Sequence, residues 1–249
     1  LMQGLRTLYG EDIRRIARNM ESVEVPPDAG EPSMEPRDLS EDYMDRLVSE
    51  FSYPRSLSVV VDGGNGAGGE VACRVLRRLG CRVTELYCRP DGDFPNHHPD
   101  PTVVENLADL RRKVVSQGAD LGIAFDGDAD RLGVVDEKGD IVWGDRVLIV
   151  LARALLAERP GATVISEVKA SRLFFSEVEE AGGKPVMAPT GHSVIKERMA
   201  REDAMLAGEM SGHIFYRDRY YGYDDALYAS LRLLEVLAGS GRPMSALTA

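Results

Sequence analysis

Three aspartates lie two residues apart near the middle of the chain, at a spacing that could bind a metal ion. Asp126, Asp128 and Asp130 stand in the segment FDGDADR (125–131), where glycine and alanine separate them. On a helix these carboxylates would splay around the axis, but in an irregular loop they can converge on one point. Converging negative charges repel one another unless a cation lies between them, and ligation by oxygen alone suits Mg²⁺ or Ca²⁺. The spacing therefore predicts a divalent-metal site.

Two short apolar segments flank this loop and would place it at the end of a strand. Leu121–Phe125 and Leu132–Val135 contain isoleucine, valine and phenylalanine, which is typical of buried strands. In α/β proteins, loops at strand ends commonly carry the binding and catalytic groups. An isolated Asp-Gly-Asp sequence is also common in solvated turns, so it is the apolar flanks that favour a functional loop here.

A second polar segment, GEMSGH (208–213), has the composition of a hydroxyl-binding loop. Glu209, Ser211 and His213 alternate along it, so an extended backbone would place all three on one side. An acceptor, a hydroxyl and an imidazole together suit neighbouring sugar hydroxyls, which both donate and accept hydrogen bonds. A glycine-rich hairpin with exposed polar residues explains the segment equally well when it is taken alone.

Cationic side chains follow a third apolar segment. Lys169 comes directly after the strand-like residues 162–168, and Arg172 follows three residues later. A lone lysine at such a place is usually part of a solvated turn. At a strand end, its ammonium group could instead hold a phosphate or move a proton at a reacting hydroxyl. His192, in PTGHSVIK (189–196), could equally be a structural histidine.

Composition limits the class of protein. The chain has 249 residues, of which 43% are hydrophobic and 29% charged, as in a soluble globular protein of one large or two ordinary domains. A net charge of −11 argues against a nucleic-acid partner. There is neither an apolar stretch of membrane-spanning length nor an N-terminal signal pattern. Three cysteines without Cys-x-x-Cys spacing suit reduced thiols in the cytoplasm. The sequence does not fix the oligomeric state, and we expect a monomer.

Apolar segments alternate with helical patterns, which predicts an α/β fold. We expect two similar α/β domains, each a mixed β-sheet packed with helices, with a boundary near residue 141. Helices are expected at 40–53 (with Ser40 as N-cap), 70–80, 103–117, 145–158, 173–181 and about 224–237, and strands at 56–61, 81–87, 121–125, 132–135, 162–168 and 184–189, with a strand, a loop and a strand in 204–216. A helical pattern before residue 25 and a proline-rich linker at 26–37 precede them.

One glycine-rich turn leaves a different function open. Gly64–Gly69 fits the G-x-G-x-x-G pattern of dinucleotide-binding turns, and Glu85 lies at about the right distance for a ribose contact. However, Asp62 and Gly63 lengthen the turn, and Glu85 falls inside its expected strand rather than at the end. Glycines that permit a tight strand-to-helix turn are the favoured interpretation, with an NAD(P)-dependent oxidoreductase as the alternative function.

Three segments together resemble the active-site loops of one family. FDGDADR (125–131) is similar to the metal loop of the α-D-phosphohexomutases, the family of phosphomannomutases and phosphoglucomutases. PTGHSVIK (189–196) and GEMSGH (208–213) resemble two further loops of that family in the expected order. The resemblance extends from about residue 38 to residue 249 and is strongest to the bifunctional phosphomannomutase/phosphoglucomutases.

The resemblance implies an isomerase that moves phosphate between O6 and O1 of mannose or glucose. Its substrates would be hexose phosphates, with hexose 1,6-bisphosphate as the intermediate and Mg²⁺ as the cofactor. The three aspartates of the 125–131 loop would bind Mg²⁺. Arg131 would neutralise phosphate, because a guanidinium group matches phosphate oxygens at two points.

The resemblance also assigns expected roles to the later polar residues. Lys169 matches a Lys-x-x-Arg loop of the family and, with Arg131 and His192, is expected to be catalytic. Glu209 and Ser211 would hold the O3 and O4 hydroxyls of the sugar. With His213 and Arg172 added, the expected substrate-binding residues are Glu209, Ser211, His213 and Arg172.

The family pattern divides the chain into three parts. Residues 1–37 resemble the tail of a first domain with its linker, 38–141 the metal-binding second domain, and 142–249 the sugar-recognition third domain. The family transfers phosphate through a serine in a loop like Thr-Ala-Ser-His-Asn-Pro, and no such loop occurs in the chain. We therefore expect a fragment that is inactive alone. A phosphoglucosamine mutase and a non-catalytic sugar-phosphate-binding fragment are the further alternatives.

Overall fold

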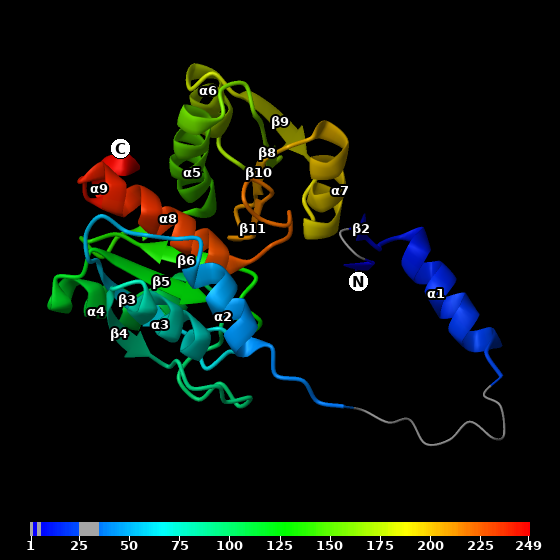
Figure 1. Cartoon of the computed structure of the whole chain (residues 1–249), viewed down its shortest axis with the longest axis horizontal. Coiled ribbons are helices and arrows are strands. Elements are labelled where there is room, and N and C mark those ends of the chain that lie inside the picture. Colours follow the sequence, from blue (N-terminus) through cyan, green and yellow to red (C-terminus); the bar gives the residue numbers. More distant parts are fainter. Residues whose placement is uncertain (1, 4–5, 25–34) are drawn as a thin grey trace.

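The computed structural model describes residues 2–3, 6–24 and 35–249, most of which form two α/β domains (Figure 1). The N-terminal segment comprises two short strands, β1 (Met2–Gln3) and β2 (Arg6–Thr7), and helix α1 (Glu11–Ser22). Helix α1 stands apart from both domains, and none of its described residues is buried (Figure 1). Residues 26–34 of the predicted linker lie outside the described residues.

The first domain is built on a five-stranded sheet with the order β4-β3-β5-β6-β7. Strands β3, β4 and β5 are parallel, whereas β6 runs antiparallel to β5, and β7 antiparallel to β6. The strands are β3 (Ser58–Asp62), β4 (Arg82–Leu86), β5 (Leu121–Phe125), β6 (Leu132–Val135) and β7 (Ile141–Val142). The helices are α2 (Ser40–Val48), α3 (Gly69–Arg78), the 3-10 helix η1 (Val104–Leu107) and α4 (Ala108–Gln117).

Both faces of this sheet are buried, which explains the continuous valines of β3. Val59 and Val61 join the core that contains Val75 of α3, whereas Val60 joins the core that contains Val114 of α4. Successive side chains of a strand point to opposite faces, so a strand covered on both sides is apolar throughout.

The second domain has a four-stranded sheet with the order β11-β10-β8-β9. Strands β8, β9 and β10 are parallel, and β11 is antiparallel to β10. The strands are β8 (Thr163–Glu167), β9 (Lys184–Ala188), β10 (Leu206–Gly208) and β11 (Ile214–Tyr216). The helices are α5 (Gly144–Glu158), α6 (Arg172–Glu180), α7 (His192–Glu202), α8 (Ala226–Ser240) and α9 (Met244–Leu247).

The two domains share one plan, so the predicted fold class is confirmed. In each, two strand–helix–strand crossovers build three parallel strands, and a fourth strand then folds back antiparallel. The loop of the hairpin β5–β6 consists of residues 126–131, which include the three aspartates, and the loop of the hairpin β10–β11 consists of residues 209–213. The two polar loops therefore occupy equivalent places in the two sheets.

Most predicted helix bounds differ from the observed ones by one or two residues, and α2 and α8 differ by more. Helix α2 begins at Ser40, but Leu39 is its N-cap and the carboxylate of Asp38 accepts the Ser40 amide at 2.8 Å. It ends at Val48 rather than at residue 53, and Ser49 is its C-cap. The last long helix begins at Ala226 instead of about residue 224, since Asp225 is its N-cap.

Helix α8 joins the cores of the two domains. It packs against α5 and β11 of its own domain and against β6 of the first domain, and Figure 1 shows it between the two sheets. Its buried leucines belong to the same core cluster as Leu121 of β5 and Val164 of β8. Most residues of α8 are buried. None of the described helices is long and apolar enough to cross a membrane.

The N-cap of α8 also connects the domains through hydrogen bonds. Asp225 accepts the amide of Tyr228 at 2.8 Å, which caps the helix. The same carboxylate accepts the hydroxyl of Tyr43, from α2 of the first domain, at 2.9 Å and that of Tyr220 at 2.6 Å. Burial raises the pKa of Asp225, against the hydrogen bonds from Tyr220, Tyr228 and Tyr43.

Replacing Asp225 by alanine should destabilise the whole chain. The change removes a helix cap and leaves two partly buried tyrosine hydroxyls without their acceptor, so we expect a loss of about 2–4 kcal/mol in the free energy of unfolding. Urea denaturation followed by circular dichroism measures it. Asp93→Ala, at an exposed position of the loop 91–101, is the control and should change stability by less than about 0.5 kcal/mol. Equal stability of the two variants would contradict this role for Asp225.

Candidate active site

The acidic loop between β5 and β6 is folded around one buried carboxylate. Asp126 is 3% exposed, and its Oδ1 accepts the backbone amides of Asp130 and Arg131, both at 3.0 Å. Ala129 takes the left-handed conformation, with φ 61°, to close this turn. Burial raises the pKa of Asp126, although the hydrogen bonds from Arg131 act in the opposite direction. The loop is therefore internally fixed.

This folding brings the three predicted metal ligands together. Oxygen atoms of Asp126, Asp128 and Asp130 all lie within 4.8 Å of one another. Asp126 is buried, Asp130 is half-buried and Asp128 is exposed. The set offers oxygen donors only, which suits a hard divalent cation such as Mg²⁺.

Arg131 is held between two carboxylates. Its Nε donates to Asp126 Oδ2 at 2.7 Å, and its Nη1 donates to Asp100 Oδ1 at 3.1 Å. Asp100 belongs to the loop between β4 and η1. Because Arg131 has these two partners, its guanidinium group is oriented beside the acidic loop rather than free in solvent.

The glycine-rich turn after β3 supports the acidic loop instead of forming a separate site. The amide of Ala67 donates to the carbonyl of Gly127 at 2.9 Å. A Cβ atom on Gly66 would lie 2.7 Å from that carbonyl oxygen, so only glycine permits the contact. Glu85, the expected ribose ligand of the dinucleotide alternative, is paired with Arg77 at 2.6 Å. The dinucleotide interpretation is not favoured.

The acidic loop is in direct contact with the GEMSGH loop of the second domain. The amide of Leu132 donates to the carbonyl of Gly212 at 3.0 Å, beside a bridge between Arg131 and His213. Gly212 has φ +96°, and a Cβ there would lie 2.5 Å from the carbonyl oxygen of Leu132. The amide of Ala226 also donates to the carbonyl of Ala129, at 3.1 Å. The domain boundary thus passes through the candidate site.

His213 connects the two loops electrostatically. Its Nε2 lies 3.3 Å from Asp130 Oδ1, and its Nδ1 lies 3.0 Å from Glu209 Oε2 and 2.8 Å from Ser211 Oγ. Burial lowers the pKa of this imidazole, but the hydrogen bonds to Asp130 and Glu209 outweigh burial and raise it to about 9. The hydrogen bond to His213 in turn lowers the pKa of Asp130.

Two buried glutamates hold the loops of the second domain. Glu209 is 4% exposed, and its Oε1 accepts the amide of Gly191 at 2.7 Å. Burial raises the pKa of Glu209, but the hydrogen bonds from His213 and Gly191 outweigh it and lower the pKa overall. Glu167, at the end of β8, accepts the amide of Met210 at 2.8 Å and the hydroxyl of Thr190. Glu167 was not among the site residues predicted from the sequence.

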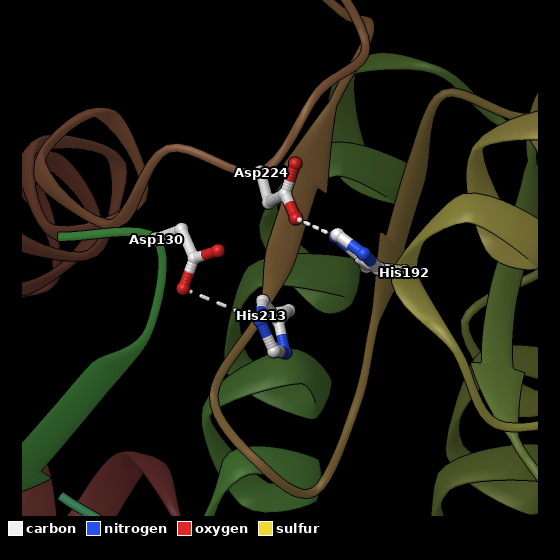
Figure 2. A group of neighbouring side chains, drawn as sticks. All are labelled: Asp130, His192, His213 and Asp224. Carbon is white, nitrogen blue, oxygen red and sulfur yellow. Dashed lines mark hydrogen bonds and ion pairs between the residues drawn. The ribbon is translucent and has the colours of Figure 1, made fainter. Parts of the chain in front are cut away.

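His192 is the first residue of α7 and is paired with an aspartate of another loop. Its Nδ1 lies 3.2 Å from Asp224 Oδ2, and Lys196 Nζ donates to Asp224 Oδ1 at 2.9 Å. Figure 2 shows the pair His192–Asp224 opposite the pair His213–Asp130. Asp224, which the sequence analysis placed only at a helix start, thus belongs to the site.

Lys169 lies in the loop after β8, as expected, whereas Arg172 is the first residue of α6. Both are exposed. Within the part of the chain that the structure describes, neither side chain has a hydrogen-bond or ion-pair partner. Their positive charges are therefore available to an anion from solution, although the structure does not bring them into the network around His213.

A cleft of about 300 Å³ lies beside the acidic loop. Asp128 and Asp130 line it from the loop, Gly68 from the N-cap of α3, and Asp224 and Asp225 from the start of α8. Carboxylates from both domains thus face one space. Such a cleft favours a cation, or an anion that arrives with one.

Comparison with known proteins agrees with this arrangement. Residues 41–139 match the family model for phosphoglucomutase/phosphomannomutase alpha/beta/alpha domain II, and residues 143–249 match the model for domain III. A phosphoglucomutase of Neisseria gonorrhoeae is 44% identical over 247 residues, which is 99% of this chain and 54% of that protein.

Two further relatives give the same result. A phosphomannomutase/phosphoglucomutase of Pseudomonas aeruginosa is 44% identical over 95% of this chain and 50% of its own length. The crystal structure of a phosphoglucomutase/phosphomannomutase family protein from Burkholderia thailandensis has a TM-score of 0.89 at 44% identity, covering 96% of this chain and 52% of that one. The chain spans about half the length of the curated relatives it matches. It belongs to the phosphoglucomutase/phosphomannomutase family, of which it contains domains II and III.

Proposed function

We propose that the chain is the central part of a phosphohexomutase that interconverts the 6-phosphates and 1-phosphates of mannose and glucose. The observation that carries this proposal is the convergence of three aspartates and Arg131 on one side of the domain boundary, in contact with the GEMSGH loop on the other. One side is suited to a cation and a phosphate, and the other to sugar hydroxyls. The names of the 44% identical relatives support the same activity.

The metal would be Mg²⁺, held by Asp126, Asp128 and Asp130. Their donor set fits it, since Oδ2 of Asp126 accepts one hydrogen bond and keeps a second lone-pair site, and Asp128 is exposed. Bound there, Mg²⁺ would withdraw charge from a phosphoryl group as that group leaves. Arg131 would neutralise the same phosphate, from a position fixed by Asp126 and Asp100.

The remaining site residues are proposed for the sugar and its second phosphate. Lys169 would move a proton at the reacting hydroxyl or hold phosphate, and Arg172 would add a second positive charge. Ser211 and Glu209 would hold the O3 and O4 hydroxyls of the sugar. To reach Glu209 Oε2, these hydroxyls would displace its contacts with Ser211 and His213. His192 and His213 would complete the hydroxyl and phosphate contacts from the second domain.

The larger protein follows from the same proposal. Residues 1–37 would be the end of a first domain with its linker, 38–141 the metal-binding domain and 142–249 the sugar-recognition domain. The partners would be hexose phosphates and hexose 1,6-bisphosphate, in a cytoplasmic and monomeric enzyme.

The 249-residue chain by itself should not act as a mutase. Phosphoryl transfer in this family uses a serine that accepts the phosphate, and the chain has no loop of that type. The test is incubation with mannose 1-phosphate, hexose 1,6-bisphosphate and Mg²⁺, with detection of mannose 6-phosphate. Turnover on the order of 1 s⁻¹ or faster, an ordinary enzymatic rate, would refute the expectation.

Mg²⁺ should bind the chain weakly and only through the acidic loop. Three carboxylates leave several positions of an octahedral ion to water, so we expect a dissociation constant no tighter than about 1 mM. In calorimetry, Asp128→Asn should abolish the signal, whereas the exposed Asp93→Asn should not change it. Unchanged binding in Asp128→Asn would place the metal elsewhere. Titration with NADH tests the dinucleotide-binding alternative. A dissociation constant in the micromolar range would support that alternative.

In the full-length enzyme, glucose and mannose phosphates should be turned over similarly. The two sugars differ only at C2, whereas Glu209 and Ser211 are proposed to contact O3 and O4. We expect kcat/KM values within about 100-fold, a gap of roughly 2.7 kcal/mol, and an equal loss for both substrates in Glu209→Gln.

Competition among mannose, glucose and glucosamine 1-phosphates distinguishes the remaining alternative. A phosphoglucosamine mutase must recognise the amino group at C2, and such recognition can discriminate by roughly 10⁴-fold. A preference for glucosamine beyond about 100-fold would therefore replace the proposed substrates.

A further inference from the structure

A second group of potential metal ligands lies beside the acidic loop. One donor atom from each of Asp130, His192, His213 and Asp224 lies within 4.8 Å of the other three. Figure 2 shows the two imidazole–carboxylate pairs facing each other across a small space. Asp130 comes from the first domain and the other three residues come from the second. The group is therefore a bridge between the domains as well as a cluster of donors.

The donor separations fit a tetrahedral ion. His192 Nδ1 lies 3.2 Å from Asp224 Oδ2, and His213 Nε2 lies 3.3 Å from Asp130 Oδ1. In a tetrahedron with bonds of about 2.05 Å, neighbouring ligands are about 3.3 Å apart. Each pair already has that separation, so binding requires the two pairs to move toward each other and the imidazoles to turn their lone pairs toward the ion. The His192 side chain is 53% exposed, which leaves it free to make that movement.

The surroundings of the group resemble the outer shell of a metal site. Glu209 Oε2 lies 3.0 Å from His213 Nδ1, so a proton on Nδ1 would leave Nε2 free to face Asp130. Imidazole ligands of metals usually donate their other nitrogen to a carboxylate in this way. Lys196 donates to Asp224 Oδ1 at 2.9 Å and leaves Oδ2 toward His192. Glu209 thus orients the His213–Asp130 pair, and Lys196 orients the His192–Asp224 pair.

We propose that Asp130, His192, His213 and Asp224 bind a transition-metal ion such as Zn²⁺, at a site distinct from that proposed for Mg²⁺. Two nitrogen and two oxygen donors suit Zn²⁺, whereas Mg²⁺ prefers oxygen alone. The site goes beyond the proposed mutase activity, because it needs neither sugar nor phosphate. Since Asp130 belongs to both groups, Zn²⁺ would compete with Mg²⁺ and hold the two domains together.

Titration of the 249-residue chain with Zn²⁺ or Co²⁺ tests the site directly. At about pH 8, where metal ions displace imidazole protons more readily, we expect one Zn²⁺ to bind with a dissociation constant on the order of 1 μM or less. Co²⁺ should give the visible absorption of a tetrahedral ion with nitrogen and oxygen ligands. Absence of binding, or an octahedral Co²⁺ spectrum, would overturn the proposal.

Matched variants distinguish this group from other sites. His192→Ala and Asp224→Asn should each weaken Zn²⁺ binding by at least about 100-fold, since loss of an outer-shell partner alone costs 10–100-fold. His98→Ala removes an exposed histidine from the first domain and should leave the dissociation constant unchanged. Asp128→Asn should weaken Mg²⁺ but not Zn²⁺, which separates failure of this proposal from failure of the proposed Mg²⁺ site.

Three further outcomes would contradict the assignment. Unchanged Zn²⁺ affinity in His192→Ala would show that His192 is not a ligand and that the four-residue assignment is wrong. Equal losses in Asp128→Asn and Asp224→Asn would mean that Zn²⁺ occupies the carboxylate site. Loss of binding in Cys88→Ser would assign the ion to the group of Cys73, Glu85 and Cys88, whose donors also lie within 4.8 Å of one another. Urea denaturation of each variant verifies that it remains folded.

Discussion

The contact between two hairpin loops is the interaction on which the candidate site depends. The hydrogen bond from Leu132 to Gly212, 3.0 Å long, joins the first residue of β6 to the loop that precedes β11. It places Asp130 against His213, and therefore the acidic loop of the first domain against the GEMSGH loop of the second. Gly212 is necessary there, because a Cβ would lie 2.5 Å from the Leu132 carbonyl oxygen. Without this close approach, each domain would carry only half of a site.

The charges at this contact explain why the loops need one another. The acidic loop buries Asp126 and half-buries Asp130, which is costly unless positive groups compensate them. Arg131 compensates the first at 2.7 Å, and His213 from the other domain compensates the second at 3.3 Å. Asp128 stays exposed and has no such partner among the described residues. The carboxylates that line the cleft thus leave a net negative charge, which is the state that a divalent cation would neutralise.

The sequence was informative where local pattern decides structure. Strands β5 and β6 end at the predicted residues, because apolar segments give way abruptly to three aspartates, and those aspartates converge as their spacing indicated. Asp100, Glu167 and Asp224 escaped prediction because each is a single carboxylate whose partner is distant in sequence. The function of the Gly64–Gly69 turn was ambiguous because its partner, Gly127, is also distant in sequence. Only the contact with Gly127 shows that the turn supports a loop, as opposed to binding a pyrophosphate. The predicted end of α2 was wrong because Phe51 of the core and Tyr53 packed against it continue the apolar pattern beyond Ser49, where the helix has already ended.

The shared plan of the two domains accounts for the placement of both loops. Each sheet ends its parallel run with a strand, β5 or β10, whose carboxyl end leads into a polar hairpin loop. Carboxyl ends of parallel strands are where α/β sheets present groups to ligands, so each domain presents one loop at its equivalent edge. Helix α8 fixes the angle between the sheets by packing on both β6 and β11. Because its N-cap Asp225 binds Tyr43 of the first domain and follows Asp224 of the site, the element that sets the domain angle also sets the distance between the two halves of the site.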